Sequence, residues 1–364
     1  MIRWRWGTVL TSGRRWRGAV ELEVALTSRR PEDPATVRAL AYPALVGDPV
    51  AGERVLLNCN ALALGLGTGG YAMVVAVPDR LPEDLDTPGH AVKARYTPQQ
   101  AVVLAVDEEV SAHRAALAAA GTGDDDLGGL PVVTADLHSA LPAIVAGVHA
   151  DRPDARVAYL MTDGGALPAW FSRTVDLLAD RLVGVVTCGQ AFGGDVEATN
   201  LHTGLLAARW AMAADVVVVA QGPGNLGTGT PWGFSGAALG EAVNAAAVLG
   251  GRPVGSLRIS DADARPRHRG LSHHSVTAYG RVALAPADLV VPAGLDADLD
   301  ALVRSALVGL ADRHRVVTVA TTGLDAALRA LPVRLSTMGR GLDADLAYFL
   351  AAAAAGRHAA ALLT

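Results

Sequence analysis

From about residue 100 to the C-terminus, short apolar runs alternate with segments of helical periodicity, and this alternation constrains the fold more than any other feature. Helical patterns such as 167–180 and 299–313 separate most of the apolar runs. The predicted strands are 101–106, 131–134, 157–162, 182–188, 215–221, 253–260, 289–292, 316–321 and 333–337. Such alternation predicts an α/β fold with a mainly parallel sheet and helices on both faces, doubly wound and Rossmann-like. A closed (β/α)8-type barrel is the alternative.

Residues 1–80 have a different pattern, in which side chains of opposite character alternate with a period of two and turn signals recur. This pattern predicts a small β-barrel or β-sandwich domain. We expect Trp4, Trp6 and Trp16 to fill its interior and the neighbouring arginines to face solvent. A Pro-rich linker, 81–100, then leads into an α/β domain at 101–364.

Composition excludes several classes of protein. Hydrophobic residues make up 51% of the chain and charged residues 18%, which favours a compact globular protein. The net charge of -5 argues against a nucleic-acid partner. We expect no membrane span and no secretory signal, and therefore a cytoplasmic protein. Cys59 and Cys188 are too far apart in sequence to imply a disulfide framework.

In either α/β fold, the loops after the carboxyl ends of the strands share one edge, where ligands bind. Polar residues gather in these loops, whereas the opposite ends carry ordinary linkers such as 151–154. The edge residues that could act chemically are Asp136, His138, Asp163, Asp261, Asp263, His273 and His274. The functional site is therefore expected at this edge.

The loop that follows the strand at 215–221 contains a match to G-x-G-x-x-G at 222–227. Residues 228–234 intervene before the next helical pattern, and no acidic residue ends a strand at the expected distance, so a dinucleotide is unlikely. The glycines would still permit a backbone cradle for a phosphate or carboxylate. The alternative is a long structural turn without a ligand. The predicted ligand-binding residues are Gly222, Gly224, Asn225, Gly227, Thr228 and Gly229.

The densest polar cluster is 265–275. Arg265 and Arg267 could hold an anion through forked guanidinium bonds, and Lys93, the only lysine in the chain, could add a compact ammonium. His273 or His274 would exchange protons, oriented by Asp163, Asp261 or Asp263. Because adjacent residues point apart on a helix, we expect at most one of these histidines to face the site, with Ser272 as the helix N-cap. The competing interpretation is a solvated loop and a capped helix.

A divalent metal ion is a possible cofactor, with Asp136, His138 and Asp263 as candidate ligands from several strand ends. No compact signature such as H-E-x-x-H supports it, and these residues could equally be turn and cap residues. The alanine-rich segment 342–361 has little polar face, so we expect it to be buried in the body or in a homo-oligomer interface.

Three stretches, 161–168, 222–230 and 270–275, resemble an uncharacterised bacterial protein family of unknown function over nearly the full chain. The resemblance implies a bacterial cytoplasmic protein and supplies no reaction. The residues themselves predict an enzyme that binds a small anionic, phosphorylated or nucleotide-like ligand at the carboxyl edge of the sheet. The alternative is a non-catalytic ligand sensor or partner-binding protein.

Overall fold

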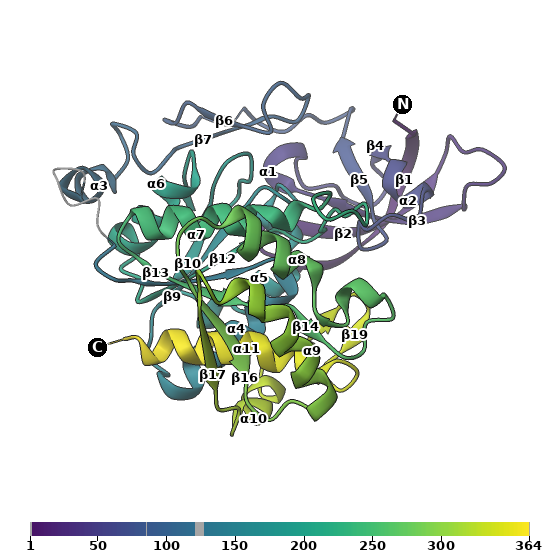
Figure 1. The fold of residues 1–364 in the computed structure, drawn as a ribbon. Helices are drawn as coiled ribbons and strands as arrows, with labels where there is room; N and C mark the ends of the chain where they lie inside the picture. Colours follow the sequence, from purple (N-terminus) through teal and green to yellow (C-terminus); the bar gives the residue numbers. More distant parts are fainter. Residues whose placement is uncertain (1, 85, 121–126, 364) are drawn as a thin grey trace. The chain divides into compact units, whose positions relative to one another are not determined.

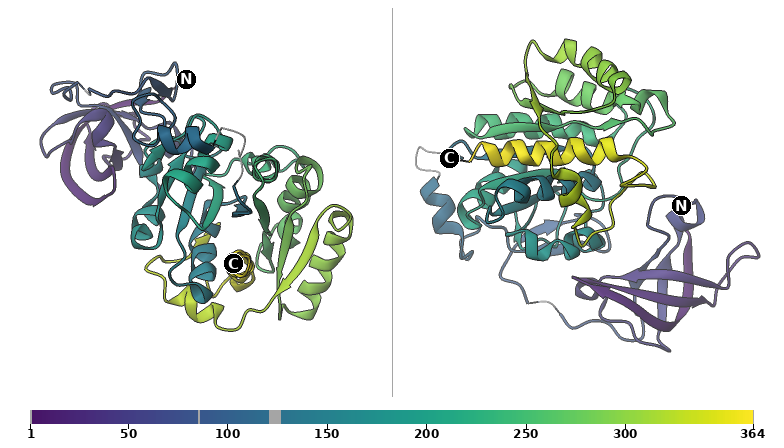
Figure 2. Two further views of the ribbon diagram at one scale, coloured as in Figure 1. Left: turned by 90° about the vertical axis from the view of Figure 1, so that its left-hand side faces the viewer. Right: turned by 90° about the horizontal axis from the view of Figure 1, so that it is seen from below.

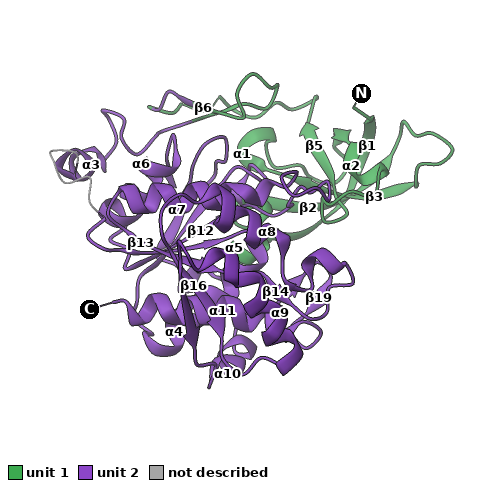
Figure 3. Ribbon diagram, in the orientation of Figure 1, with its two compact units in different colours: residues 1–88, 92–102, 170–176 green, residues 89–91, 103–169, 177–364 purple. Residues whose placement is uncertain are grey.

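The computed structural model describes residues 2–84, 86–120 and 127–363. The chain divides into two compact units (Figure 3). The first comprises residues 1–88, 92–102 and 170–176, and the second comprises 89–91, 103–169 and 177–364.

The first unit contains a closed β-barrel with the strand order β1-β2-β3-β5-β4. Its strands are β1 (Trp4–Trp16), β2 (Ala19–Leu26), β3 (Thr36–Ala41), β4 (Arg54–Asn58) and β5 (Ala72–Ala76), with short helices α1 (Pro43–Val46) and α2 (Asn60–Ala63). Alternate residues of β2, Val20, Leu22 and Val24, are fully buried in the barrel core. The predicted N-terminal barrel is therefore confirmed.

The expectation that the tryptophans of β1 point into the barrel and its arginines point to solvent is wrong for Trp4 and Arg5. Arg5 is buried and its Nε atom lies 2.5 Å from Asp33 Oδ2, whereas Trp4 is 45% exposed. The interior explains this, because a Cβ at the inward-facing Gly7 would lie only 2.4 Å from a methyl carbon of Val24. At Gly7 the barrel interior has no room for a side chain, and the ion pair with Asp33 compensates the buried Arg5 charge.

Two predicted elements differ in the structure. The expected strand 101–106 is reduced to β7 (Ala101–Val103), which pairs with β6 (Ala91–Lys93) outside the large sheet. The expected helix 167–180 is divided into η2 (Ala169–Phe171), α5 (Arg173–Leu177) and η3 (Ala179–Arg181). Its residues 170–176 belong to the first unit, where the carbonyl of Trp170 accepts a 2.7 Å hydrogen bond from the Trp16 indole.

The second unit is built on an open eight-stranded sheet in the order β11-β10-β9-β12-β8-β13-β16-β17 (Figure 1). Its neighbouring strands all pair in parallel. The strands are β8 (Pro131–Ala135), β9 (Val157–Thr162), β10 (Gly184–Thr187), β11 (Val196–Glu197), β12 (Val216–Gln221), β13 (Arg252–Ser256), β16 (Asp288–Pro292) and β17 (Arg315–Val319). The parallel sheet is confirmed, and the closed (β/α)8 alternative is wrong because this sheet does not close.

Helices cover both faces of the sheet. In Figure 1, α7 (Leu239–Val248) lies above the sheet, and α4 (Leu141–Asp151) and α11 (Leu346–Ala361) lie below it, as the view from below in Figure 2 also shows. Helix α11 is buried, as its composition predicts. The remaining helices of this unit are α3 (Arg114–Ala120), α6 (Leu201–Leu206), α8 (His273–Thr277), α9 (Ala297–Leu307) and α10 (Leu324–Arg329). No helix among the described residues is both long enough and apolar enough to cross a membrane.

The winding direction of the sheet reverses between β8 and β12. The chain passes from β8 through α4 to β9, toward one side of the sheet, and from β12 through α7 to β13, toward the other side. These two strands are hydrogen-bonded neighbours. Because their connections diverge, a crevice forms beyond their carboxyl ends. Asp136 follows β8 at this crevice, and Gln221 ends β12.

Candidate functional site

The loop between β13 and α8 carries most of the candidate residues. The expected single strand 253–260 is interrupted, because β13 ends at Ser256 and Ile259–Ser260 forms β14, which pairs antiparallel with β15 (Gly270–Leu271). This pairing closes a loop that includes the 3-10 turn η6 (Pro266–His268). Helix α8 then begins after Ser272, whose Oγ atom accepts a 3.2 Å hydrogen bond from the His274 amide. The predicted N-cap is therefore confirmed.

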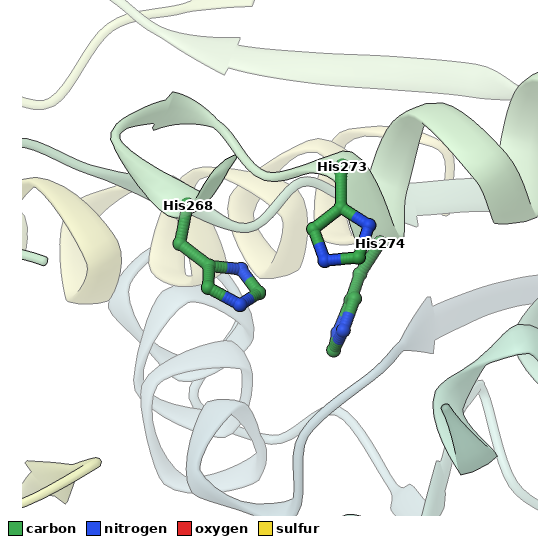
Figure 4. Close-up of side chains that lie close together, drawn as sticks. All are labelled: His268, His273 and His274. Atoms are coloured by element: carbon green, nitrogen blue, oxygen red, sulfur yellow. The ribbon is translucent and has the colours of Figure 1, made fainter. Parts of the chain in front are cut away.

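Three histidine rings of this loop and helix lie together (Figure 4). The ring centroids of His268 and His273 are 4.9 Å apart, and those of His273 and His274 are 4.5 Å apart. The expectation that His273 and His274 point apart is wrong. Both occupy the first turn of α8, and Phe234 from the preceding connection stacks on His274 at 3.8 Å and meets the edge of His273 at 5.9 Å. A residue from another element thus fixes both rings.

A buried charged group lies beside these rings. Asp136 Oδ2 lies 3.2 Å from His274 Nδ1 and 3.5 Å from Arg258 Nη1. Each of these three side chains is at most 5% exposed. Burial acts to raise the pKa of Asp136, but the hydrogen bond with His274 and the charge of Arg258 outweigh it, so the pKa lies below its usual value. Asp136 is therefore an ionised carboxylate held by two partners.

Asp263 extends this group on the other side of Arg258. Its Oδ2 atom lies 3.6 Å from Arg258 Nη2 and 2.7 Å from Arg265 Nη2. Arg340 Nη2 contacts the same oxygen at 3.2 Å. The hydrogen bond from Arg265 is the largest cause that holds the pKa of Asp263 well below its usual range. Arg265 therefore acts in the structure as a partner of Asp263.

His268 and His273 are neutral at physiological pH. Burial lowers the pKa of His268 to about 3 and that of His273 to about 4, and neighbouring positive charges add to this effect. The Nδ1 atom of His268 lies 2.7 Å from Ser272 Oγ. The Nε2 atom of His273 is buried and has no hydrogen-bond partner in the described structure. Neutral imidazoles can act as proton acceptors or as metal ligands.

The glycine loop at 222–229 is hydrogen-bonded to residues on either side of it. The Thr228 amide donates to the Gly233 carbonyl at 2.7 Å, and the Leu226 amide donates to Ser235 Oγ at 3.1 Å. Asn225 Oδ1 accepts a 2.7 Å hydrogen bond from Gln221 Nε2. These contacts occupy part of the backbone that an anion cradle would use. Gly224 and Gly229 have positive φ angles, as the predicted turn chemistry requires.

The glycine loop and the polar cluster 265–275 approach each other at Gly229. A Cβ at this position would lie 3.5 Å from Arg267 Nη2. Arg267 itself is exposed. The rim next to the histidines therefore combines flexible glycine backbone with a guanidinium group.

The other predicted site residues have different surroundings. Asp163 is exposed and its Oδ2 atom accepts a 2.8 Å hydrogen bond from the Gln190 amide, while Asp261 is also exposed. His138 Nδ1 lies 3.1 Å from the Tyr159 hydroxyl, and burial lowers its pKa to about 4. Lys93 lies in β6 of the first unit with 2% of its surface exposed.

Sequence reasoning missed Arg258 and Phe234 as members of the site. Arg258 lies inside the expected apolar strand 253–260, and its isolated charge was the only sign of a special role. The sequence placed His268 among the polar residues of this edge and gave it no role. Nothing in the local pattern around Phe234 marks it, because its importance comes from stacking on a ring of another element.

Cavity volume does not single out this site. The crevice at the winding reversal, lined by Asp136, Gln221 and Ser235 among others, measures only about 10 Å³. A cavity of about 490 Å³ lies at the opposite edge of the sheet, around Arg152, Arg209 and Arg252. There the arginines donate to carbonyls, including those of Leu362 and Leu363 that follow α11. The arginines of the larger cavity thus satisfy carbonyls at the end of a helix, whereas the histidine edge contains the buried titratable groups.

The fold and site define a two-unit α/β protein with an N-terminal barrel and a histidine-rich edge on a parallel sheet. Residues 38–356 match the family described as "Protein of unknown function (DUF3866)", and the chain belongs to that family. Neither the comparison with curated proteins nor that with solved structures gives a match.

Proposed function

We propose that this protein is an enzyme that binds a small anionic, phosphorylated or nucleotide-like substrate at the carboxyl edge of the eight-stranded sheet. The observation that carries the proposal is the buried group of Asp136, His274 and Arg258 beside two neutral histidines. Fully buried charges are costly, and perturbed titratable groups concentrate at functional sites. The reversal of winding between β8 and β12 supports the same place, because doubly wound, Rossmann-like sheets bind ligands there.

In this proposal the anion contacts Arg267 and the glycine backbone at 222–229. Arg267 precedes His268 in the loop and approaches the glycine backbone at Gly229, so the two can contact one ligand beside the histidines. Asp136 orients His274 through its Nδ1 atom. Roles for Asp163, Asp261 and Lys93 remain predictions from the sequence.

The proposal is tested by binding and then by turnover. Thermal-shift measurements on the full chain with inorganic phosphate, sugar phosphates, nucleotides and small carboxylates identify ligands, and NMR follows whether each ligand is converted. We expect at least one phosphorylated compound to bind and to be consumed. Arg267→Gln should lower its affinity about tenfold or more, because a charge-assisted hydrogen bond contributes about 1.5–3 kcal/mol.

Arg269→Gln is the matched control, since Arg269 is also exposed and lies two residues further along the loop. It should leave the affinity unchanged. A ligand that binds at this edge and is recovered unchanged after long incubation would favour the non-catalytic sensor. Equal losses in both variants would show that only the general charge of the loop matters.

A further inference from the structure

The histidine cluster has the geometry of a metal centre. One ring nitrogen from each of His268, His273 and His274 lies within 4.8 Å of the others. No other group of three or more metal-binding side chains this close occurs among residues 2–84, 86–120 and 127–363. Because an ion bonded at about 2 Å brings such nitrogens to within roughly 3.5 Å of one another, small side-chain shifts complete the site. We infer that these three histidines bind a divalent transition-metal ion, with Zn²⁺ as the reference case.

The hydrogen bonds assign the ligating atoms. His268 Nδ1 lies 2.7 Å from Ser272 Oγ, and His274 Nδ1 lies 3.2 Å from Asp136 Oδ2 and 3.3 Å from Arg258 Nη1. In both rings this leaves Nε2 as the atom for the ion. His273 Nε2 is buried without a hydrogen-bond partner, which is costly unless a ligand satisfies it. The ion is therefore held by three Nε2 atoms.

The groups behind the rings match those of known metal sites in general. A metal-bound histidine usually directs its second nitrogen to a carboxylate or another oxygen, which fixes the ring and its tautomer. Asp136 supplies that carboxylate to His274, and Ser272 supplies a hydroxyl to His268. Phe234, stacked on His274 at an interplanar angle of 4°, adds a rigid wall. The rings are thus oriented before an ion arrives.

The ligand set selects the type of ion. Imidazole nitrogens suit Zn²⁺, Co²⁺ and Ni²⁺, whereas Mg²⁺ requires oxygen ligands. The nearest buried carboxylates, Asp136 and Asp263, already face Arg258 at 3.5 and 3.6 Å. They are therefore engaged as partners of this cation and offset its charge. That compensation allows a second positive charge to bind beside Arg258.

Three protein ligands leave one tetrahedral position open, as in zinc sites that bind water or substrate. An ion with such a position lowers the pKa of its bound water to near 7. Metal binding itself does not depend on the proposed function. Only a role for the open position in binding the substrate, together with Arg267 and the glycine loop, rests on the proposed function.

The test is direct metal binding by the full chain after treatment with a chelator. Titration with Co²⁺ should produce the intense visible absorption of a tetrahedral site at one ion per chain, and Zn²⁺ should displace it. His268→Ala and His273→Ala should each weaken Zn²⁺ binding by about 100-fold or more, beyond the roughly 10–100-fold loss expected for the supporting Asp136→Asn change. His273 is only partly buried, so its variant is expected to fold, and circular dichroism verifies this.

His202→Ala is the matched control, because His202 is an exposed histidine of the same unit outside the cluster. It should keep wild-type affinity. Failure of the wild-type protein to bind Co²⁺ or Zn²⁺, or unchanged affinity in folded His273→Ala, would overturn the inference. Stabilisation by inorganic phosphate that is lost in His273→Ala, with no metal bound to the wild-type protein, would instead identify an anion site formed by the histidines.

The two proposals can fail separately. Stoichiometric metal binding without conversion of any anionic compound would leave the metal site standing and count against the enzyme. Turnover that survives chelation unchanged would support the enzyme and contradict the metal site.

Discussion

At the scale of single residues, Asp136 is the most consequential side chain of the site. It is 3% exposed, it neutralises the charge of Arg258, and it accepts a hydrogen bond from His274. Asp136→Asn removes a negative charge and leaves a buried guanidinium only partly compensated. We expect a loss of about 3 kcal/mol in the free energy of unfolding, the usual result of breaking a buried ion pair. Urea denaturation at neutral pH measures it.

Asp343→Asn gives the comparison. Asp343 pairs with Arg329 at 2.6 Å, but its side chain is 80% exposed. Exposed ion pairs contribute about 1 kcal/mol or less, so this variant should lie close to wild type. Similar losses in the two variants would mean that the charge of Asp136 is not needed to hold Arg258 in the fold.

The sequence predicted which types of residue gather at the edge, but not how they contact one another. Asp136, Asp263, His273 and His274 follow strand ends, and the parallel-sheet rule places such positions together. Whether His273 and His274 face the same space depends on Phe234, which belongs to another element. Side-chain direction of this kind is set by tertiary packing, so no local pattern contains it.

At the scale of elements, α4 and α11 approach so closely that each requires a glycine. A Cβ at Gly147 would lie 1.9 Å from the Ala353 carbonyl oxygen, and a Cβ at Gly356 would lie 2.0 Å from the Ile144 carbonyl oxygen. The obstacles are backbone atoms, which cannot move independently of the helices. The alanine-rich sequence of α11 thus serves close backbone packing within the body.

Gly356→Ala should therefore destabilise the protein by about 2 kcal/mol or more, since overpacking outweighs the roughly 1 kcal/mol that alanine contributes to a helix. Gly309→Ala is the control, because a Cβ there meets nothing within 4 Å. It should remain within about 0.5 kcal/mol of wild type. Thermal and urea unfolding of both variants test the point, and equal stabilities would show that the two helices can separate at little cost.

His314 links three elements and predicts a dependence of stability on pH. Its Nδ1 accepts from the Ala287 amide at 3.1 Å, before β16, and its Nε2 lies 2.8 Å from the Tyr279 carbonyl. Burial lowers its pKa below the usual 6.5. The unfolded chain therefore binds this proton more readily, so stability is full above about pH 6.5 and falls as the pH decreases below that value.

Urea unfolding between pH 5 and pH 7.5 measures the slope, and His314→Asn should reduce it. His202→Asn replaces an exposed histidine and should retain the wild-type slope. If His314→Asn leaves the slope intact, other groups are responsible for the acid sensitivity.

At the scale of the whole molecule, strand existence was predictable and strand order was not. Strands such as β9 and β12 are buried on both faces and appear as continuous apolar runs. The two-residue β11 is too short to leave such a signal. The run at 333–337 does not join the sheet, and the run at 101–106 meets it through an isolated bridge between Ala105 and Glu197 of β11. The insertion of β12 between β9 and β8 depends on long-range pairing, which the spacing of the runs does not encode.

The strand order predicts a gradient of local stability across the second unit. All residues of β8 and β12 are buried at its centre, whereas the edge strand β17 is largely intermediate or exposed. Amide hydrogen exchange should therefore be slowest in β8 and β12, where it requires unfolding of the whole unit, and much faster in β17, where local opening suffices. Equal protection of β17 and β12 would contradict this gradient. Protection of β17 that increases with protein concentration would show that a second copy of the chain covers this edge in a homo-oligomer.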